Sequence, residues 1–375
     1  MQSPASILLV HQGAELYGSD RTFVQTVRAL SERWPNTRIT VVIPYGGELE
    51  NVLAPLVDEI QKKNLAILRR SNIRHMRLST AVSLLKKVVA ACRTVRGHDL
   101  VYVNTAVIVD FLLALMLTRR NGIIHVHELP GALLAFVLST IFAFTRCSLI
   151  FNSSATQNAF YVAPWLSANV IWNGTAPITK PLERAHHGTL NLLLLGRFNS
   201  WKGQLLLLEA VSLLQPDKLR SVRIRLVGNT FGNQTHFEEC VRLAIRDRKL
   251  SEIAEMCPFS SDPDEHYAWA DVVVVPSTKP EPFGLTAIEA MARERAVIAA
   301  GHGGLTDIVS DGVTGILFEP RSATRLASAI SNYISCPELA LTHGFAGKKR
   351  ADELFNEHNY MGGVGDICEA VLRSS

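Results

Sequence analysis

Short apolar runs alternate with helix-like segments along the whole chain. In the first half, strand-like runs at 6–11 and 38–43 enclose a helical pattern near 21–33. Further strands are expected at 100–104, 123–127, 149–152 and 169–172. This rhythm is typical of βαβ units that build a parallel sheet.

A second series of the same kind begins at 190–195 (LNLLLL), a continuous apolar run that fits a strand covered on both faces. Its later strands are expected at 223–227, 253–257, 271–275 and 296–299. Between the two series, residues 173–188 are polar and include two prolines, which is typical of an interdomain linker.

The length of 375 residues is too great for one ordinary core, which agrees with two domains. We therefore predict an α/β protein with two tandem, doubly wound, Rossmann-like domains. Residues 1–172 form the first domain and 189–359 the second, and a C-terminal helix at 360–375 returns to the first. Because ligands bind at the carboxyl ends of parallel strands, the two sheets are expected to face a common cleft.

The charge is distributed unevenly between the two halves. Residues 1–175 hold 17 Lys and Arg against 10 Asp and Glu, a net charge of +7, whereas the remainder holds 21 against 24. A basic first half favours an anionic partner, either a phosphate-bearing acceptor or a membrane surface. The alternative is a solvated basic surface without a partner.

Several features predict a cytoplasmic protein that touches the membrane from its inner face. The six cysteines form no CxxC pair, and the N-terminus lacks a signal-peptide pattern. The longest apolar stretch, 131–144, has 14 residues and is too short to span a bilayer. The segment 83–96 reads as a basic amphipathic helix, although buried helices show the same pattern.

The segment 280–291 (PEPFGLTAIEAM) is the strongest candidate for a ligand site. It follows the apolar run DVVVV, and its Pro–Phe283–Gly284 junction opens into a helix-forming sequence. A helix start presents unpaired N–H groups to an anion such as a diphosphate. Glu281 precedes the helix and Glu289 lies one turn inside it, so the two carboxylates can address different hydroxyls. The alternative is a surface helix with two solvated glutamates.

Arg197 and Lys202 follow the strand-like run 190–195 in the sequence GRFNSWKG. Arginine offers a planar fork for phosphate oxygens and lysine a point charge, so together they can neutralise a diphosphate. Surface charges on a loop are the alternative. Asp262 and Asp264 have the spacing of a metal-binding pair, but Pro263 between them favours a helix start. We therefore expect no metal ion and no cofactor, with positive side chains and a helix dipole in the metal's place.

Two weaker candidates lie in the first half. The loop 11–21 carries Gly13 and Gly18, which permit a tight turn and close backbone approach, but it matches neither a dinucleotide nor a Walker motif. His125 and His127 are two apart on a strand and should share a face. His127 can hydrogen-bond a sugar hydroxyl or polarise a reacting group. The alternative is a core histidine, and a metal site lacks a third ligand.

The order of these motifs resembles that of the retaining glycosyltransferases of family 4, which have the GT-B fold, here of bacterial polysaccharide or lipopolysaccharide type. The matching segments are GRFNSWKGQ, LVG, PFSSDPDEHYAWADVVVVPS, EPFGLTAIEAMA and GGLTDIVSDGVTG, with a weaker match at LYGSDRTFVQTVRAL, HVHELP and IWNGT. The family often has a Gly-Gly-Ala-Glu-like sequence where this chain reads GSDR, which affects the acceptor side.

The resemblance implies residue roles at the donor site. It assigns the diphosphate to Arg197 and Lys202, the transferred sugar to Glu281 and the ribose to Glu289. It further implies that the N–H groups of Leu285 and Thr286 meet the phosphates, beside Phe283 and Gly284 at the helix start. The segment from Cys257 to Phe259 would meet the nucleobase, and Gly18 would lie under the diphosphate. His127 resembles the cleft histidine near the reacting sugar.

The resemblance implies a hexosyltransferase that moves a sugar from a nucleotide diphosphate sugar to a glycan or lipid-linked oligosaccharide, with retention and without a metal. It implies no nucleic-acid partner. Two alternatives stay open: a GT-B nucleotide-sugar 2-epimerase, and a non-catalytic nucleotide-sugar-binding subunit of an assembly complex. The sequence does not select the sugar, the base, the acceptor or the oligomeric state.

Overall fold

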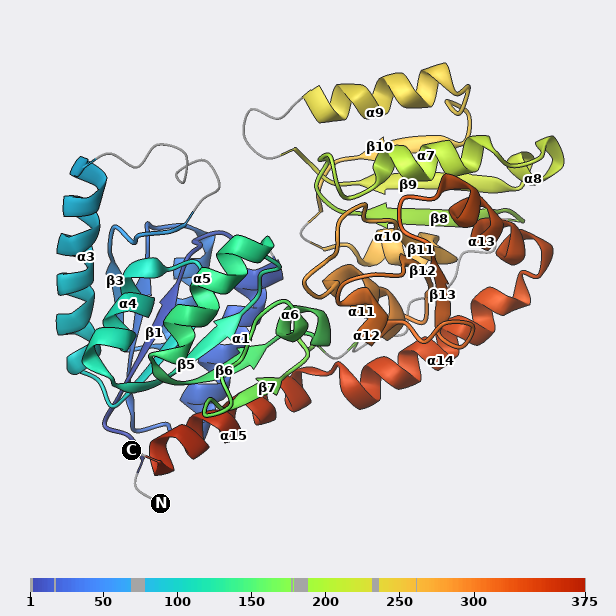
Figure 1. Cartoon of the computed structure of the whole chain (residues 1–375). Helices are drawn as coiled ribbons and strands as arrows, with labels where there is room; N and C mark the ends of the chain where they lie inside the picture. The colour runs from blue at the N-terminus through green and yellow to red at the C-terminus, as the bar shows by residue number, and fades with distance from the viewer. Residues whose placement is uncertain are drawn as a thin grey trace. The chain divides into compact units, whose positions relative to one another are not determined.

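The computed structural model describes residues 3–16, 18–68, 78–176, 178, 188–230, 236–260 and 262–374. The chain divides into two compact units (Figure 1). Unit 1 comprises Met1–Gly174 and Glu357–Ser375, and unit 2 comprises Thr175–Asn356. Unit 1 ends two residues after the predicted 172, and its C-terminal segment begins three residues before the predicted 360, whereas unit 2 begins at Thr175, inside the predicted linker. Most of the predicted linker, residue 177 and residues 179–187, falls outside the described residues.

Unit 1 contains a seven-stranded parallel sheet in the order β3-β2-β1-β4-β5-β6-β7. Its strands are β1 Ser6–His11, β2 Arg38–Ile43, β3 Glu59–Lys62, β4 Leu100–Asn104, β5 Asn121–Val126, β6 Arg146–Phe151 and β7 Ala168–Val170. The sequence does not predict β3, because three of its four residues, EIQK, are polar and the strand is only partly buried at the sheet edge.

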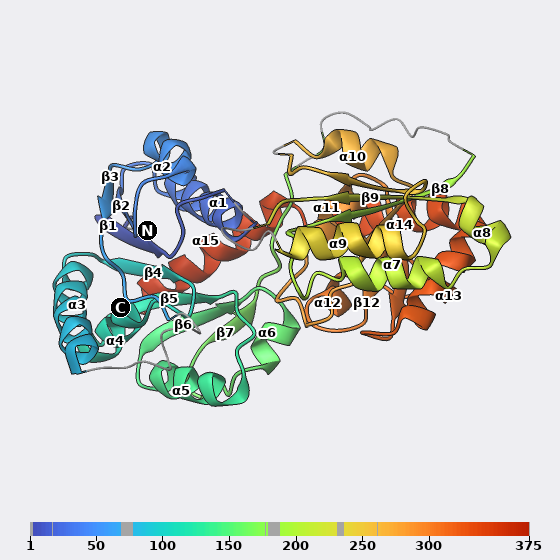
Figure 2. The ribbon, with the colours of Figure 1, turned by 90° about the horizontal axis from the view of Figure 1, so that it is seen from above.

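Helices cover both faces of this sheet (Figures 1 and 2). One core cluster joins the sheet to α3 Leu78–Arg96, α4 Val109–Thr118 and α5 Ala132–Ala143. The other joins it to α1 Gly18–Arg33, α2 Glu48–Leu53 and α15 Glu357–Arg373. The short elements are η1 Ala54–Leu56 and α6 Ser154–Asn158. Side chains from both faces of the central strands are therefore removed from water, which explains their continuous apolar runs.

The C-terminal helix differs from its prediction. The sequence places it at 360–375, after a glycine-rich stretch, whereas α15 begins at Glu357 and runs through those glycines. A Cβ at Gly365 would stand 2.8 Å from the guanidinium of Arg33 on α1, and one at Gly363 would contact Ile171. Close packing against unit 1 thus outweighs the low helix propensity of glycine.

Unit 2 contains a six-stranded parallel sheet in the order β10-β9-β8-β11-β12-β13. Its strands are β8 Leu190–Leu195, β9 Val222–Val227, β10 Ala254–Cys257, β11 Val272–Val275, β12 Ala296–Ala300 and β13 Gly315–Phe318. Its helices are α7 Gln204–Ser212, α8 Pro216–Arg220, α9 His236–Asp247, α10 Asp264–Trp269, α11 Leu285–Ala292, α12 Leu305–Ile308, α13 Ala323–Ser335 and α14 Glu338–Leu354. The predicted helix start at Asp264 is confirmed.

Each sheet has one point where the winding of the chain reverses. In unit 1 it lies between β1 and β4, and in unit 2 between β8 and β11. In open α/β sheets, ligands bind outside the carboxyl ends of the strands at such a point. No helix among the described residues is both long and apolar enough to cross a bilayer.

Candidate active site

The reversal point of unit 2 holds a partly buried ion pair. The Lys202 ammonium donates to Oε1 of Glu281 at 2.7 Å, and the Ser277 hydroxyl donates to the same oxygen at 2.5 Å. Glu281 is 6% exposed and Ser277 is fully buried. Since Lys202 follows β8 and Ser277 follows β11, their shared contact with Glu281 joins the two strand ends on either side of the reversal point.

The loop after β8 is shaped by one glycine and one asparagine. Gly203 has φ +85°, and a Cβ there would lie 2.1 Å from the carbonyl oxygen of Pro276 at the end of β11. The side-chain oxygen of Asn199 accepts from the backbone nitrogens of Trp201 and Lys202. The Lys202 ammonium lies 4.7 Å from the Trp201 ring centroid. These contacts fix the lysine, while Arg197 extends from the same loop as an exposed side chain.

The loop after β12 packs against the backbone of Glu281. The backbone nitrogen of Gly304 donates to the Glu281 carbonyl at 2.8 Å, and a Cβ at Gly303 would lie 2.4 Å from that carbonyl. The imidazole Nε2 of His302 donates to the Ser277 carbonyl at 2.8 Å, and burial lowers the pKa of His302. Sequence reasoning missed Ser277 and His302. The sequence feature that could have pointed to them is that each follows the carboxyl end of a buried strand.

Helix α11 starts beside this pair. Its N-cap, Gly284, has φ +127°, and a Cβ there would meet the Leu305 side chain at 2.6 Å. Leu285 and Thr286 form the first turn, whose N–H groups have no partner within the helix. The Phe283 side chain is 3% exposed and packs edge-to-face on Phe355, so the structure places this predicted donor contact in the core.

Glu289 lies one turn inside α11 and is held from α10. The Tyr267 hydroxyl donates to its Oε2 at 2.9 Å, and burial raises the pKa of Tyr267, so the phenol stays a donor. The Arg293 guanidinium lies 4.7 Å from the Tyr267 ring centroid and pairs with Asp264 at 2.6 Å. The carboxylate is thereby oriented by a side chain that sequence reasoning did not select.

The predicted nucleobase segment follows β10. Cys257 is partly buried, and burial raises the pKa of its thiol. Phe259 is 49% exposed, and its backbone nitrogen donates to the side chain of Asn229 at 3.0 Å. Asn229 in turn accepts, through its carbonyl, from the nitrogen of Phe198 beside Arg197. Backbone bonds thus connect the ends of β8, β9 and β10.

Two predicted residues belong to unit 1. His127 directly follows β5, and burial lowers its pKa to about 3, so its ring is neutral. The prediction that His125 shares its face is confirmed, because the two ring centroids are 3.9 Å apart. His125 is buried, and its Nδ1 lies 2.7 Å from the Tyr102 hydroxyl. Gly18 opens α1, and its carbonyl accepts from the Thr22 hydroxyl.

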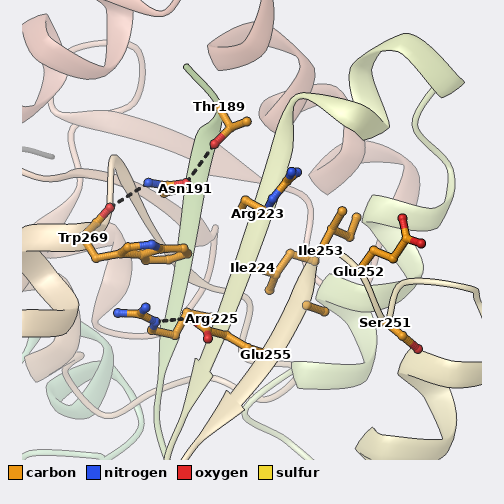
Figure 3. A pocket seen from close by; sticks show the side chains of 11 residues that line it. Thr189, Asn191, Arg223, Ile224, Arg225, Ser251, Glu252, Ile253, Glu255 and Trp269 are labelled. Atoms are coloured by element: carbon orange, nitrogen blue, oxygen red, sulfur yellow. Dashed lines mark hydrogen bonds and ion pairs between the residues drawn. The ribbon is translucent and has the colours of Figure 1, made fainter. Parts of the chain in front are cut away.

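The described residues contain no group of three or more His, Cys, Asp or Glu side chains arranged to hold a metal ion. A cavity of about 470 Å³ lies near the amino ends of β8, β9 and β10 (Figure 3). There the Arg225 guanidinium lies 4.2 Å from the Trp269 ring centroid. None of the predicted site residues lines it, so the candidate site and this cavity are separate.

Comparison with known proteins gives a family match within unit 2. Residues 182–350 match the family described as glycosyl transferases group 1. The chain contains a group 1 glycosyltransferase domain. All of the candidate residues from Arg197 to Glu289 lie inside the matched range. The group 1 domain therefore contains the Lys202–Glu281 pair and the start of α11.

Two curated relatives and one solved structure extend this result. The chain is 34% identical over 170 residues to a D-inositol 3-phosphate glycosyltransferase from Pseudarthrobacter chlorophenolicus, covering 44% of this chain and 39% of that protein. It is 35% identical over 154 residues to a lipopolysaccharide 1,2-N-acetylglucosaminetransferase from Salmonella typhimurium, covering 39% of this chain and 40% of that protein. The alignments thus span about two fifths of the curated relatives.

The fold is similar over nearly the whole chain to that of HepE from Anabaena, solved in complex with UDP-glucose. The TM-score is 0.78 at 22% identity, with 99% of this chain and all of that one covered. The predicted fold class, two parallel-sheet Rossmann-like domains of GT-B type, is confirmed.

Proposed function

We propose that this protein is a retaining glycosyltransferase that moves a hexose-type sugar from a nucleotide diphosphate sugar to a glycan or lipid-linked glycan, without a metal ion. The supporting observation is the convergence of Lys202, Glu281 and the start of α11 at the reversal point of unit 2. The names of the relatives and the UDP-glucose in the similar structure agree with this proposal.

In this proposal, the donor diphosphate lies against Arg197, Lys202 and the N–H groups of Leu285 and Thr286. These groups stabilise the negative charge that grows on the leaving phosphate, which is the role a metal ion would otherwise take. Because Lys202 is already paired with Glu281, its position is fixed before the donor arrives. The Tyr267-held carboxylate of Glu289 accepts from the ribose hydroxyls.

Glu281 faces the transferred sugar, whose anomeric carbon gains positive character as the phosphate leaves. The acceptor hydroxyl attacks from the face that the phosphate leaves, and a phosphate oxygen takes its proton. Retention then needs no covalent intermediate with the enzyme. His127 contributes to the sugar side as a neutral ring.

Lys202→Ala tests this proposal in purified protein with a panel of nucleotide sugars. We expect kcat/KM to fall by about 100-fold or more, because one charge-stabilising group is lost. Lys348→Ala, which removes a surface lysine paired with Asp352 in the same unit, is the matched control. Full transfer by the Lys202 variant, or loss of activity in EDTA, would contradict the proposal. Epimerised free nucleotide sugar without acceptor would favour an epimerase, and donor binding without turnover a non-catalytic subunit.

We also propose that unit 1 contacts an anionic membrane through an apolar surface around α5. Leu133, Phe136 and Val137 lie on one face of this helix, Phe144 directly follows its last residue, and Leu133 and Phe136 are 78% and 70% exposed. A helix that is apolar on nearly all sides is normally buried. Here the described residues leave one face exposed, so it is available to a partner.

The surroundings of α5 favour a bilayer as that partner. Trp165 is 72% exposed, and its indole nitrogen donates to the carbonyl at the end of the helix. Arg119, Arg120 and Arg146 are exposed nearby, and residues 129–182 contain no Asp or Glu. Aromatic side chains and cations around an apolar face are typical of an interfacial helix on anionic lipid.

Cosedimentation with phosphatidylglycerol vesicles tests this contact. We expect Phe136→Ser to weaken binding by about 10-fold, since one large apolar side chain no longer leaves water. Phe345→Ser is the matched control, because Phe345 lies in unit 2 with the same 70% exposure. Equal losses in both variants, or equal binding to neutral phosphatidylcholine, would contradict the proposal. Concentration-dependent self-association lost with Phe136 would assign the surface to a second copy of the chain.

A further inference from the structure

A row of polar side chains crosses the carboxyl edge of the unit 1 sheet. His11, Asn104, His127 and Asn152 lie at the ends of four neighbouring strands, β1, β4, β5 and β6. Asp20 of α1 lies at one end, with its Oδ1 2.7 Å from Nε2 of His11. We call these five residues the polar row. It includes the reversal point between β1 and β4, where a ligand of this sheet is expected.

Hydrogen bonds connect each neighbour in the polar row. The Asn104 amide nitrogen lies 2.9 Å from Nδ1 of His11, and the Asn104 oxygen lies 3.1 Å from Nε2 of His127. The Asn152 amide nitrogen lies 3.3 Å from Nδ1 of His127. Both ring nitrogens of His127 are therefore occupied by amide groups of the protein itself.

The carboxylate and the asparagine amides together set the direction of the hydrogens in the polar row. A carboxylate only accepts, so Nε2 of His11 donates to Asp20, and the Asn104 amide nitrogen, which only donates, faces Nδ1 of His11. The Asn104 oxygen then accepts, so Nε2 of His127 must donate. Nδ1 of His127 in turn accepts from Asn152. One arrangement of hydrogens thus satisfies all four bonds without a conflict.

Burial makes this arrangement hard to exchange. His11 and Asn104 are fully buried, Asn152 is 3% exposed and Asp20 is 4% exposed, whereas His127 is partly exposed. Buried polar groups rarely go without a hydrogen bond, so reversing one member requires reversing the others. The His11 ring also stacks on Phe23 at 4.4 Å, which fixes its plane.

We propose that Asp20, His11 and Asn104 are positioning residues that hold His127 as a neutral imidazole with its hydrogen on Nε2. The inference concerns unit 1 alone, and only its kinetic consequence rests on the proposed function. His127 then acts neither as general acid nor as general base in sugar transfer. It presents a fixed, uncharged ring to the sugar, and a sugar hydroxyl binds its ring nitrogens only by displacing an asparagine.

Three titratable side chains lie closest to His127 in the polar row and beside it. The His125 ring lies against it in a tilted arrangement, with the ring centroids 3.9 Å apart, and His11 faces it across Asn104. The Glu128 carboxylate accepts from the backbone nitrogen of His127 and from Thr105, and burial raises the pKa of Glu128. Burial also lowers the pKa of His127, in agreement with the arrangement that the bonds require.

Nitrogen-15 NMR of donor-free protein labelled at histidine rings tests the tautomer directly. We expect His127 to show a protonated Nε2 and an unprotonated Nδ1 from pH 8 to pH 5. An Nδ1–H tautomer, or titration near the ordinary histidine pKa of about 6.5, would overturn the proposal. The measurement needs no variant and no sugar transfer, so it stands or fails separately from the proposed function.

Two variants then test the positioning role. Asp20→Asn keeps the shape but can donate as well as accept, so we expect a mixed His127 tautomer. Asn104→Leu removes both amide contacts, and we expect a mixed tautomer and a fall in kcat of about 100-fold, as a misplaced group near the reaction gives. Tyr102→Phe, which removes a buried hydroxyl from His125 instead, should leave the His127 tautomer unchanged. An unaltered tautomer in Asp20→Asn would contradict the proposal.

Discussion

The pKa of His127 makes a quantitative prediction about the stability of unit 1. Burial lowers this pKa to about 3, whereas an unfolded histidine titrates near 6.5. Between these values the folded state binds fewer protons than the unfolded state. The free energy of unfolding therefore decreases as the pH falls below about 6.5. At pH 5 the loss from this one group is about 2 kcal/mol relative to pH 8, because 1.5 pH units at about 1.36 kcal/mol each separate pH 5 from the unfolded pKa.

His127→Gln isolates this contribution, because the glutamine does not titrate. At pH 8 the variant should be less stable than wild type, since its side chain does not reproduce both bonds to Asn104 and Asn152. At pH 5 the gap in unfolding free energy should be smaller by about 2 kcal/mol. Contributions from His125 and other groups are present in both proteins and cancel to first order in the difference.

The assay is pulsed hydrogen exchange with mass spectrometry along a urea titration at pH 8, 6.5 and 5. Peptides from unit 1 report its own transition, which is needed because two units can unfold separately. Tyr360→Phe serves as the non-titrating control, since its loss should be the same at every pH. A pH-independent gap for His127→Gln would refute the neutral ring on which the reasoning depends.

Three further substitutions test the local geometry. Gly203→Ala should destabilise unit 2 by more than about 2 kcal/mol in urea unfolding, because its φ is +85° and its Cβ would collide with a backbone carbonyl. Tyr267→Phe should weaken donor binding several-fold in calorimetry while the fold persists, because Glu289 loses the hydroxyl that orients it; unchanged affinity would contradict the ribose role. Tyr360→Phe should cost unit 1 about 1–3 kcal/mol, since the 2.6 Å bond to Thr26 is buried.

The central strands were predictable because their apolar runs are continuous. The predicted ends of β8 coincide with the structure, and β11 begins one residue later than predicted and ends where predicted. The same reasoning associates Lys202 with Glu281, although they are 79 residues apart, because both follow strands of one sheet. Their direct ion pair and the contact with the Ser277 hydroxyl were not predictable. Such side-chain contacts depend on the loop geometry, which cannot be derived from the spacing of residues in the sequence.

Other parts of the fold depend on packing that the sequence pattern hides. The glycines of α15 read as a helix boundary, yet they allow the approach of Arg33 and Ile171. The carboxylate of Asp20, in the first turn of α1, contacts His11, which the local sequence pattern does not reveal. In both cases a tertiary contact, and not local propensity, decides the structure.

The two reversal points differ in their electrostatics. At the end of β8 and β11, Lys202 and Glu281 place opposite charges beside a helix start. At the ends of β1, β4, β5 and β6, the Asp20 carboxylate, two histidine rings and two asparagine amides are joined by hydrogen bonds. A diphosphate needs compensation of charge, whereas sugar hydroxyls need fixed donors and acceptors. Charge-altering substitutions should therefore act mainly on donor affinity in unit 2, and substitutions that alter the His127 tautomer mainly on turnover in unit 1.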